Sequence, residues 1–310
     1  MENNKINRSI ELNNGYKMPI LGFGTFKSES LSDHIYNVIQ AGVRLIDTAE
    51  YYENEKEVGS GIKKALENNI VKREDLFVVT KIWPTHFDAS NNGELMENTI
   101  KKQLDLLNLD YVDLYLAHWP CPSFDDKKNE FPKQPWFKLW PVFESFVDKK
   151  YTKSIGVSNF NVQLLLDLLS YCRIKPVINQ VEFHPYLCQN NLLEFCKKVD
   201  IRLMAYNSLV SGVYVNDDNK KYDIKNNKTI CEISKKHNKT EVQIILNWAI
   251  SKKVVVIPKS NNIDRVKQNL ETLEFKLSNE ELDMIDKLDE NKRFNYTSRF
   301  KWTNNIDLFA

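Results

Sequence analysis

The sequence predicts an α/β fold, a (β/α)8 (TIM) barrel, in a single domain that spans residues 1–310. Short apolar runs alternate with segments whose apolar residues recur at helical spacing, a pattern typical of a parallel sheet. Eight such runs fall between residues 22 and 260, which fits a closed barrel better than an open sheet. Polar side chains follow these runs, and barrels place their functional groups on the loops after their strands.

The elements follow in order along the chain. Asp47, Lys81 and His118 each end an apolar run, and the gaps of 34 and 37 residues leave room for one strand and one crossover helix. Strands are expected to end at residues 22–24, 47, 81, 118, 158–159, 182–184, 206 and 258–260. Helices are expected at residues 31–41, 58–66, 95–107, 162–169, 192–199 and 263–270.

Two further segments flank the barrel. Residues 10–18 predict a hairpin with Asn14-Gly15 in a type I′ turn, which could cap the bottom of the barrel. Near the other end, Ser278 and Glu281 form a capping box that opens a helix through Leu288. Residues 289–310 are rich in aromatics without helical spacing, and we expect them to cover the barrel mouth as a substrate loop.

Composition excludes several classes of function. The formal charge is +1 with charges scattered along the chain, which gives no electrostatic case for nucleic acid or an anionic membrane. No apolar span is long enough for a membrane helix, and the first 14 residues are too polar for a secretory signal. Five cysteines without close pairs indicate reduced thiols in a cytosolic protein, and no metal-ligand spacing occurs.

The strand-end residues suggest acid catalysis. Asp47 and Lys81 can form an ion pair in the barrel mouth, although such a pair is often only structural. Tyr51 and Tyr52 follow closely, and a phenol beside a lysinium loses its proton more readily, so either could serve as a general acid. His118 is ambiguous, because a histidine at a strand end is frequently structural.

Two Trp-Pro steps occur on adjacent loops, at Trp83-Pro84 and Trp119-Pro120. Indole walls around the barrel mouth suit an apolar carbonyl substrate. His184, which precedes Pro185, is interpreted as structural because no acid or base partner is expected nearby.

Three segments together resemble the aldo-keto reductases, of the aldose-reductase-like kind. Residues 47–59 (DTAEYYENEKEVG) look like the first family signature, residues 109–120 (LDYVDLYLAHWP) resemble the fourth strand, and residues 257–260 (IPKS) resemble the late cofactor motif. The similarity extends over roughly residues 10–295. It implies NADPH-dependent reduction of aldehydes or ketones, including aldoses, with a catalytic tetrad of Asp47, Tyr52, Lys81 and His118.

The resemblance also implies where cofactor and substrate bind. NADPH would contact Gly24, Thr25, Asp47, Ser158, Asn159, Gln180, Tyr206, Asn207, Ser208, Leu209, Lys259, Ser260, Asn262, Arg265, Gln268 and Asn269, with Lys259, Ser260 and Arg265 at the 2′-phosphate. A small carbonyl substrate would contact Trp83, His118, Trp119, Phe124 and Trp302. The stretch at residues 208–212 and the loop through residue 221 depart from the family's usual belt over the cofactor.

Two other readings stay open at this point. The chain could be a non-catalytic barrel that binds nucleotide, although all four tetrad residues are present. Lys81 could instead form a Schiff base as in an aldolase, although Asp47 would keep it protonated. The family default is a monomer.

Overall fold

Eight parallel strands form the barrel in the computed structural model, which describes residues 6–28, 30–210 and 222–309. The sheet order is β10-β9-β8-β7-β6-β5-β4-β3, so each strand pairs with its neighbours in the chain. The strands are β3 (Phe23–Gly24), β4 (Leu45–Asp47), β5 (Phe77–Ile82), β6 (Leu114–Ala117), β7 (Ile155–Ser158), β8 (Ile178–Glu182), β9 (Arg202–Tyr206) and β10 (Val255–Val256). The predicted (β/α)8 barrel is thereby confirmed.

The barrel closes between its first and last strands. Leu21 forms a parallel bridge with Val256. The Gly22 amide donates to the Val256 carbonyl at 2.8 Å, and the Val256 amide donates to the Ile20 carbonyl at 3.0 Å. This short seam joins β3 to β10 and completes the ring of strands.

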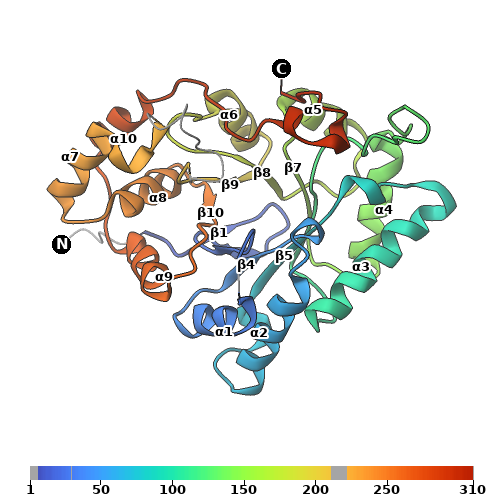
Figure 1. Ribbon diagram of the computed structural model, residues 1–310, viewed down its shortest axis with the longest axis horizontal. Coiled ribbons are helices and arrows are strands. Elements are labelled where there is room, and N and C mark those ends of the chain that lie inside the picture. The colour runs from blue at the N-terminus through green and yellow to red at the C-terminus, as the bar shows by residue number, and fades with distance from the viewer. Residues whose placement is uncertain (1–5, 29, 211–221, 310) are drawn as a thin grey trace.

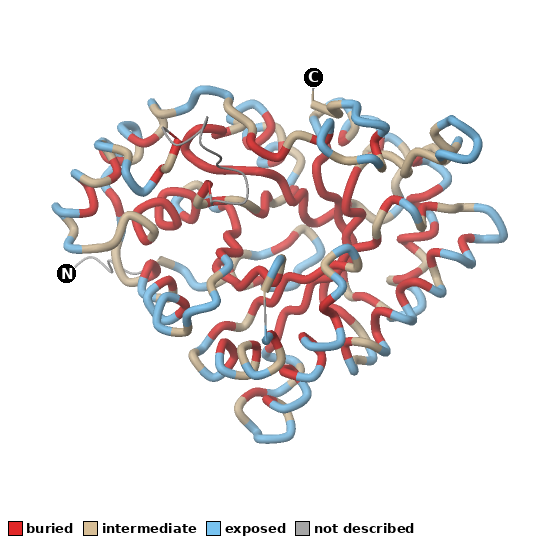
Figure 2. Tube along the Cα trace, viewed as in Figure 1, coloured by how far each residue is buried: buried red, intermediate tan, exposed pale blue. Residues whose placement is uncertain are grey.

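Helices surround the barrel and shield the strands from solvent, as Figure 1 shows. The strands are buried along nearly their whole length, whereas the helices expose their outer faces (Figure 2). The helices are α1 (Leu31–Gln40), α2 (Glu55–Glu67), α3 (Glu94–Leu107), α4 (Trp136–Asp148), α5 (Val162–Tyr171), α6 (Asn190–Lys198), α7 (Lys228–His237), α8 (Glu241–Ser251), α9 (Ile263–Leu270) and α10 (Asn279–Asp286). The predicted helices coincide with six of these, and α10 opens with the predicted Ser278–Glu281 capping box.

The N-terminal hairpin consists of β1 (Ser9–Glu11) and β2 (Lys17–Pro19). Its buried Leu12 and Met18 pack with residues that fill the barrel interior. The Asn13 side chain donates to the carbonyls of Pro176 and Asp200, which precede β8 and β9, so the hairpin closes the N-terminal end of the barrel.

The predicted type I′ turn is wrong in detail. Gly15 has a positive φ of 85°, but Asn14 is not among the residues with positive φ, as a type I′ turn would require. The Gly15 amide instead bonds the Leu12 carbonyl at 2.9 Å. The turn therefore places Asn13 and Asn14 at its centre and uses Gly15 as a left-handed bulge residue.

Candidate active site

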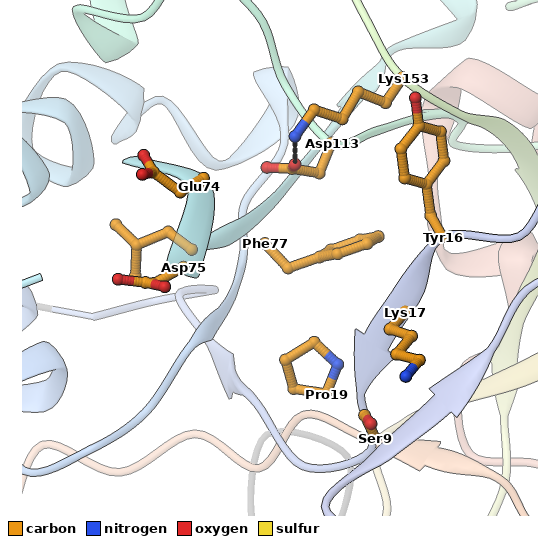
Figure 3. A pocket seen from close by; sticks show the side chains of 10 residues that line it. Ser9, Tyr16, Lys17, Pro19, Glu74, Asp75, Phe77, Asp113 and Lys153 are labelled. Carbon is orange, nitrogen blue, oxygen red and sulfur yellow. Dashed lines mark hydrogen bonds and ion pairs between the residues drawn. The ribbon is translucent and has the colours of Figure 1, made fainter. Parts of the chain in front are cut away.

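A cavity of about 500 Å³ lies at the C-terminal ends of the barrel strands. The last residues of four strands line it, namely Gly24, Asp47, Ser158 and Tyr206, together with Gln180 from the middle of β8. A smaller cavity of about 190 Å³ lies at the opposite end, between the hairpin and the start of β5, where Lys153 pairs with Asp113 (Figure 3). Parallel barrels carry their functional groups at the C-terminal face, so the larger cavity is the candidate site.

Lys81 contacts two of the other three predicted catalytic residues, Asp47 and Tyr52. Its fully buried ammonium donates to Asp47 Oδ1 at 2.7 Å, to the Thr48 carbonyl at 2.9 Å and to Tyr52 Oη at 3.3 Å. All three ammonium N–H groups therefore have an acceptor. Tyr52 lines the cavity, whereas Lys81 lies behind it and reaches the cavity through the phenol.

Asp47 is held on its other side as well. Its Oδ2 accepts a hydrogen bond from Gln180 Nε2 on β8 at 2.8 Å, across the barrel interior. The Asp47 carbonyl accepts from both the backbone amide and the hydroxyl of Thr25, each at 3.0 Å. These contacts fix the carboxylate that holds Lys81.

Side chains from the surrounding helices contact the β5 strand at Lys81. The Gln103 side chain on α3 donates to the Lys81 carbonyl at 3.1 Å and to Glu55 Oε1 on α2 at 2.9 Å. Tyr115 in turn donates to Gln103 at 2.7 Å. Burial raises the pKa of Glu55 to about 6. This polar cluster lies between β5 and the helices α2 and α3. It holds the Lys81 backbone at a fixed position along the barrel axis.

The pKa of Tyr52 shifts in the direction opposite to the prediction. Burial first, and then the charge of Asp47, raise the pKa of the phenol well above 10. The reason is that Asp47 neutralises Lys81, so the ion pair presents little net positive charge to offset the loss of hydration. The phenol is thus held in its protonated, proton-donating form.

His118 faces the same space. Its ring packs edge-on against Trp83, with centroids 5.0 Å apart, and against Tyr52, with centroids 5.7 Å apart. Burial, followed by the charge of Lys81, lowers the pKa of the imidazole well below 6.5. Nδ1 is buried and has no hydrogen-bond partner among the residues that the structure describes. A neutral histidine with a free ring nitrogen can donate a hydrogen bond to, or orient, a group in the cavity.

Tyr51 and Tyr52 lie on a short 3-10 helix, η1 (Glu50–Tyr52), and their side chains make different contacts. Tyr52 points to Lys81, whereas Tyr51 is 42% exposed and stacks on Trp83 with centroids 4.0 Å apart and rings 16° from parallel. Glu50 ties this helix to the Trp83 loop, because Oε2 accepts from the Trp83 amide at 2.8 Å and Oε1 pairs with His86 Nδ1 at 2.7 Å. The sequence analysis gave Glu50 no role, since its partners lie more than 30 residues away.

Amide and hydroxyl groups form the wall opposite the aromatics. Asn159 Nδ2 donates to the His118 carbonyl at 3.0 Å, and its Oδ1 accepts from the Tyr206 hydroxyl at 2.8 Å. Ser158 Oγ donates to the Gln180 carbonyl at 2.8 Å. This wall offers neutral polar groups deep in the cavity, and Lys259 adds a cation to the lining.

Buried Glu182 anchors the chain that enters the C-terminal segment. Its carboxylate accepts hydrogen bonds from the amides of Phe294 and Asn295, each at 3.1 Å, and from Asn207 Nδ2 at 2.9 Å. Arg293 lies 3.6 Å away. Burial alone would raise the pKa of Glu182, but bonds and charges from His184, Asn207 and Arg293 outweigh it and lower the pKa. His184 therefore has an acidic partner, which the sequence analysis did not expect, and this buried contact agrees with the predicted structural role.

The C-terminal segment reaches the cavity after this anchor. Phe300 lines the cavity. Trp302 packs on Trp83 and Trp119, with centroid distances of 5.3 Å and 5.2 Å. Thr297 is fully buried and accepts from the Leu308 amide at 2.7 Å, which folds the segment back on itself.

The structure brings most of the predicted site residues together. Besides Tyr52, the predicted residues that line the cavity are Gly24, Thr25, Asp47, Trp83, His118, Trp119, Ser158, Asn159, Gln180, Tyr206, Asn207, Ser208, Leu209 and Lys259. Those that lie outside its lining are Lys81, which reaches the cavity through Tyr52, and Phe124, Ser260, Asn262, Arg265, Gln268, Asn269 and Trp302. Asn262 instead caps α9, and the Phe124 amide bonds the Trp302 carbonyl at 2.8 Å.

Lining residues to which the sequence analysis assigned no cofactor or substrate contact of their own are Phe26, Lys27, Tyr51, Ile257, Pro258, Asn295 and Phe300. Phe26 and Lys27 lie two and three residues after the end of β3, which is the signal that could have found them. The departures predicted at residues 211–221 lie outside the described residues. Within the described ranges, no cluster of three metal-binding side chains occurs, and no helix is long and apolar enough to cross a membrane.

Comparisons with known proteins agree with this geometry. The model of the aldo/keto reductase family matches residues 14–290. A probable NAD(P)H-dependent D-xylose reductase of Aspergillus clavatus is 40% identical, over 93% of this chain and 92% of its own length. The NAD(P)H-dependent D-xylose reductase I,II of Candida tropicalis and the NADH-dependent D-xylose reductase of Candida parapsilosis are each 39% identical, over 97% of this chain and 98% of their own lengths. The chain therefore belongs to the aldo/keto reductase family of oxidoreductases.

Proposed function

We propose that this aldo/keto reductase is an NAD(P)H-dependent reductase of small aldehydes, with aldoses as its substrate class. The observation that carries the proposal is the contact of 3.3 Å between Lys81 Nζ and Tyr52 Oη, at a cavity that Tyr52 and His118 both line. A phenol that is protonated and backed by an ammonium can release its proton to a developing alkoxide.

Each tetrad residue then has a distinct task. Tyr52 donates the proton to the carbonyl oxygen. Lys81 stabilises the resulting phenolate through its hydrogen bond, and Asp47 holds Lys81 in position. His118, which burial keeps neutral, donates a hydrogen bond that orients the carbonyl. Such groups are fixed before the reaction, so they stabilise the developing charge without reorganisation.

The polar wall of the cavity fits a nicotinamide cofactor. NAD(P)H, when bound, supplies the hydride that reduces the carbonyl carbon. The carboxamide needs neutral donors and acceptors, which Ser158, Asn159 and Gln180 offer at the deep end of the cavity. Tyr206 presents a ring for stacking, and Lys259 provides positive charge for phosphate, with Ser260 and Arg265 nearby in the chain.

The aromatic wall supports a compact aldehyde as substrate. Phe26, Tyr51, Trp83, Trp119 and Phe300 line the cavity, and ring faces of this kind can pack against the C–H faces of a sugar. Asn295 adds an amide to the same lining and donates to the Tyr206 hydroxyl at 3.2 Å. Relatives named as D-xylose reductases agree with an aldose.

The two alternatives receive less support. A Schiff base at Lys81 would need an exposed, free amine, but this side chain is fully buried and donates to three acceptors. A non-catalytic barrel would have no need for an intact tetrad. The geometry of Asp47, Tyr52, Lys81 and His118 therefore favours catalysis.

The test follows the loss of absorbance at 340 nm with purified protein, NADPH or NADH, and D-xylose or glyceraldehyde. Tyr52→Phe should lower kcat for reduction by about a hundredfold or more, because general acid catalysis contributes factors of about 10² to 10⁴. Cofactor binding should stay unchanged, since the hydroxyl acts in the transition state.

Tyr51→Phe is the matched control, because Tyr51 neighbours Tyr52 but its ring stacks on Trp83. It should leave kcat nearly intact. Near-normal turnover by the Tyr52 variant would contradict the assignment, and no turnover of any aldehyde by the wild type would contradict the function.

A monomeric state and a cytosolic location belong to the same proposal. All five cysteines are free in the structure, which agrees with a reducing compartment. Size-exclusion chromatography with light scattering would measure the mass in solution, and a mass of two chains would contradict the monomer.

A further inference from the structure

The loop at residues 257–262 joins β10 to α9 and carries Lys259, which lines the cavity. Within the loop, Ser260 Oγ and the Asn262 backbone hydrogen-bond each other at 3.2 Å. Asn262 caps α9 by accepting from the amides of Asp264 and Arg265. These bonds shape the C-terminal half of the loop but do not fix Lys259 against the barrel.

Two hydrogen bonds from the β3–α1 unit flank Lys259 on both sides. The Gly24 amide at the end of β3 donates to the Pro258 carbonyl at 3.4 Å. On the other side, His34 Nε2 on α1 lies 2.7 Å from the Ser260 carbonyl oxygen. A carbonyl oxygen only accepts, so Nε2 carries the proton in this contact.

His34 is itself held in place. Its half-buried ring packs against Phe23 of β3, with centroids 5.4 Å apart. The helices α1 and α9 are in contact and lie side by side in Figure 1. A fixed imidazole therefore spans the gap between the first helix of the barrel and the loop that follows its last strand.

We propose that His34 is a positioning residue for cofactor selectivity, because its bond to the Ser260 carbonyl holds the Lys259 backbone in the orientation that presents the ammonium to the 2′-phosphate of NADPH. This inference rests on the proposed function, in which Lys259 binds that phosphate. A lysine on a loose backbone must be ordered when the phosphate binds, and this ordering weakens affinity. NADH has no 2′-phosphate and gains nothing from the orientation of Lys259.

The alternative is that His34 only packs α1 against the barrel. Its loss would then lower the melting temperature and weaken both cofactors alike. Affinity for each cofactor separates the two cases, because only a positioning role distinguishes NADPH from NADH.

The experiment measures Kd for NADPH and NADH by quenching of tryptophan fluorescence, without turnover, in the full-length wild type, His34→Ala and His34→Gln. His34→Ala should weaken NADPH by about three- to tenfold, the factor that corresponds to the net value of one hydrogen bond. NADH should change less than about twofold, well below that factor. Glutamine retains an N–H donor at this position, so His34→Gln should bind NADPH more tightly than His34→Ala.

A double-mutant cycle with Lys259→Met completes the test. In the Lys259→Met background, His34→Ala should have no further effect on NADPH, because the group that it positions is absent. An undiminished effect there, or equal losses for both cofactors, would overturn the role of His34. If Lys259→Met alone left NADPH affinity unchanged, the placement of the phosphate would be wrong. A loss of affinity in Lys259→Met together with no loss in His34→Ala would refute the inference and leave the proposed function intact.

Discussion

Replacing Glu182 by glutamine should loosen the C-terminal segment and the Asn207 loop together. The two carboxylate oxygens accept bonds from the amides of Phe294 and Asn295 and from the Asn207 side chain. In Glu182→Gln, the side-chain amide can take two orientations. In either one, its NH2 group faces buried N–H donors that need an acceptor. Arg293 also loses the negative charge that lies 3.6 Å away.

The magnitude follows from this count of donors. A buried donor without an acceptor costs about 1 to 3 kcal/mol, and one or two donors lose their partner, so the free energy of unfolding should fall by about 2 to 4 kcal/mol. Because Asn295 and Phe300 line the cavity just beyond the anchor, KM for the aldehyde should rise more than kcat falls. Removing every acceptor with alanine would risk unfolding, since total stability is only about 5 to 15 kcal/mol.

Urea denaturation monitored by fluorescence gives the free energy of unfolding, and steady-state kinetics give KM and kcat. The matched control is Glu67→Gln on α2, whose side chain is 66% exposed and should cost less than about 0.5 kcal/mol. A Glu182→Gln variant as stable as this control, with unchanged KM, would refute the assignment of Glu182 as the anchor.

Three further predictions concern other parts of the molecule. Lys259→Met with Arg265→Met should weaken NADPH by several kcal/mol, at about 1.5 to 3 per charge-assisted bond, and spare NADH; equal losses in fluorescence titrations would misplace the phosphate site. Trp302→Ala should raise KM for bulky aromatic aldehydes more than for glyceraldehyde, because Trp302 packs on Trp83 and Trp119; a uniform loss with a lower melting temperature would indicate a structural role only. Bonds from Lys236, Ser278 and His237 outweigh the effect of burial and lower the pKa of Glu281 to about 2, so the stability that its carboxylate adds is present above pH 4.5 and lost as pH falls toward 2. Glu281→Gln should therefore destabilise the protein at neutral pH and not below about pH 2, and a constant difference in urea midpoints across this range would contradict the shift.

The sequence predicts those parts of the site that depend on strand order. Asp47, Lys81 and His118 each follow an apolar run, and parallel strands bring such residues to one end of a barrel whatever the details of packing. Their meeting could thus be predicted, and the distances at Lys81 agree with it. The choice of Tyr52 over Tyr51 depends on family resemblance, and the contacts of the two phenols agree with it: Tyr52 Oη lies 3.3 Å from Lys81 Nζ, whereas the Tyr51 ring stacks on Trp83.

Other features depend on contacts that no local pattern reveals. Glu182 finds its partners at residues 207 and 293–295, and Glu50 finds His86 on another loop. The direction of the Tyr52 pKa depends on how far burial outweighs a neutralised lysine, which requires coordinates. The hairpin turn was misassigned because Asn-Gly is compatible with several turns, and the register of β1 and β2 decides among them.

The seam that closes the barrel has a thermodynamic consequence. It rests on short strands, β3 and β10, and both run directly into the loops that line one side of the cavity, at Gly24 and Lys259. A molecule bound across these loops contacts residues on both sides of the seam, so opening the seam would disrupt its contacts. Binding of a ligand in the cavity and closure of the barrel are then linked equilibria. Ligand binding lowers the population of locally opened barrels, by an amount that depends on the ligand concentration.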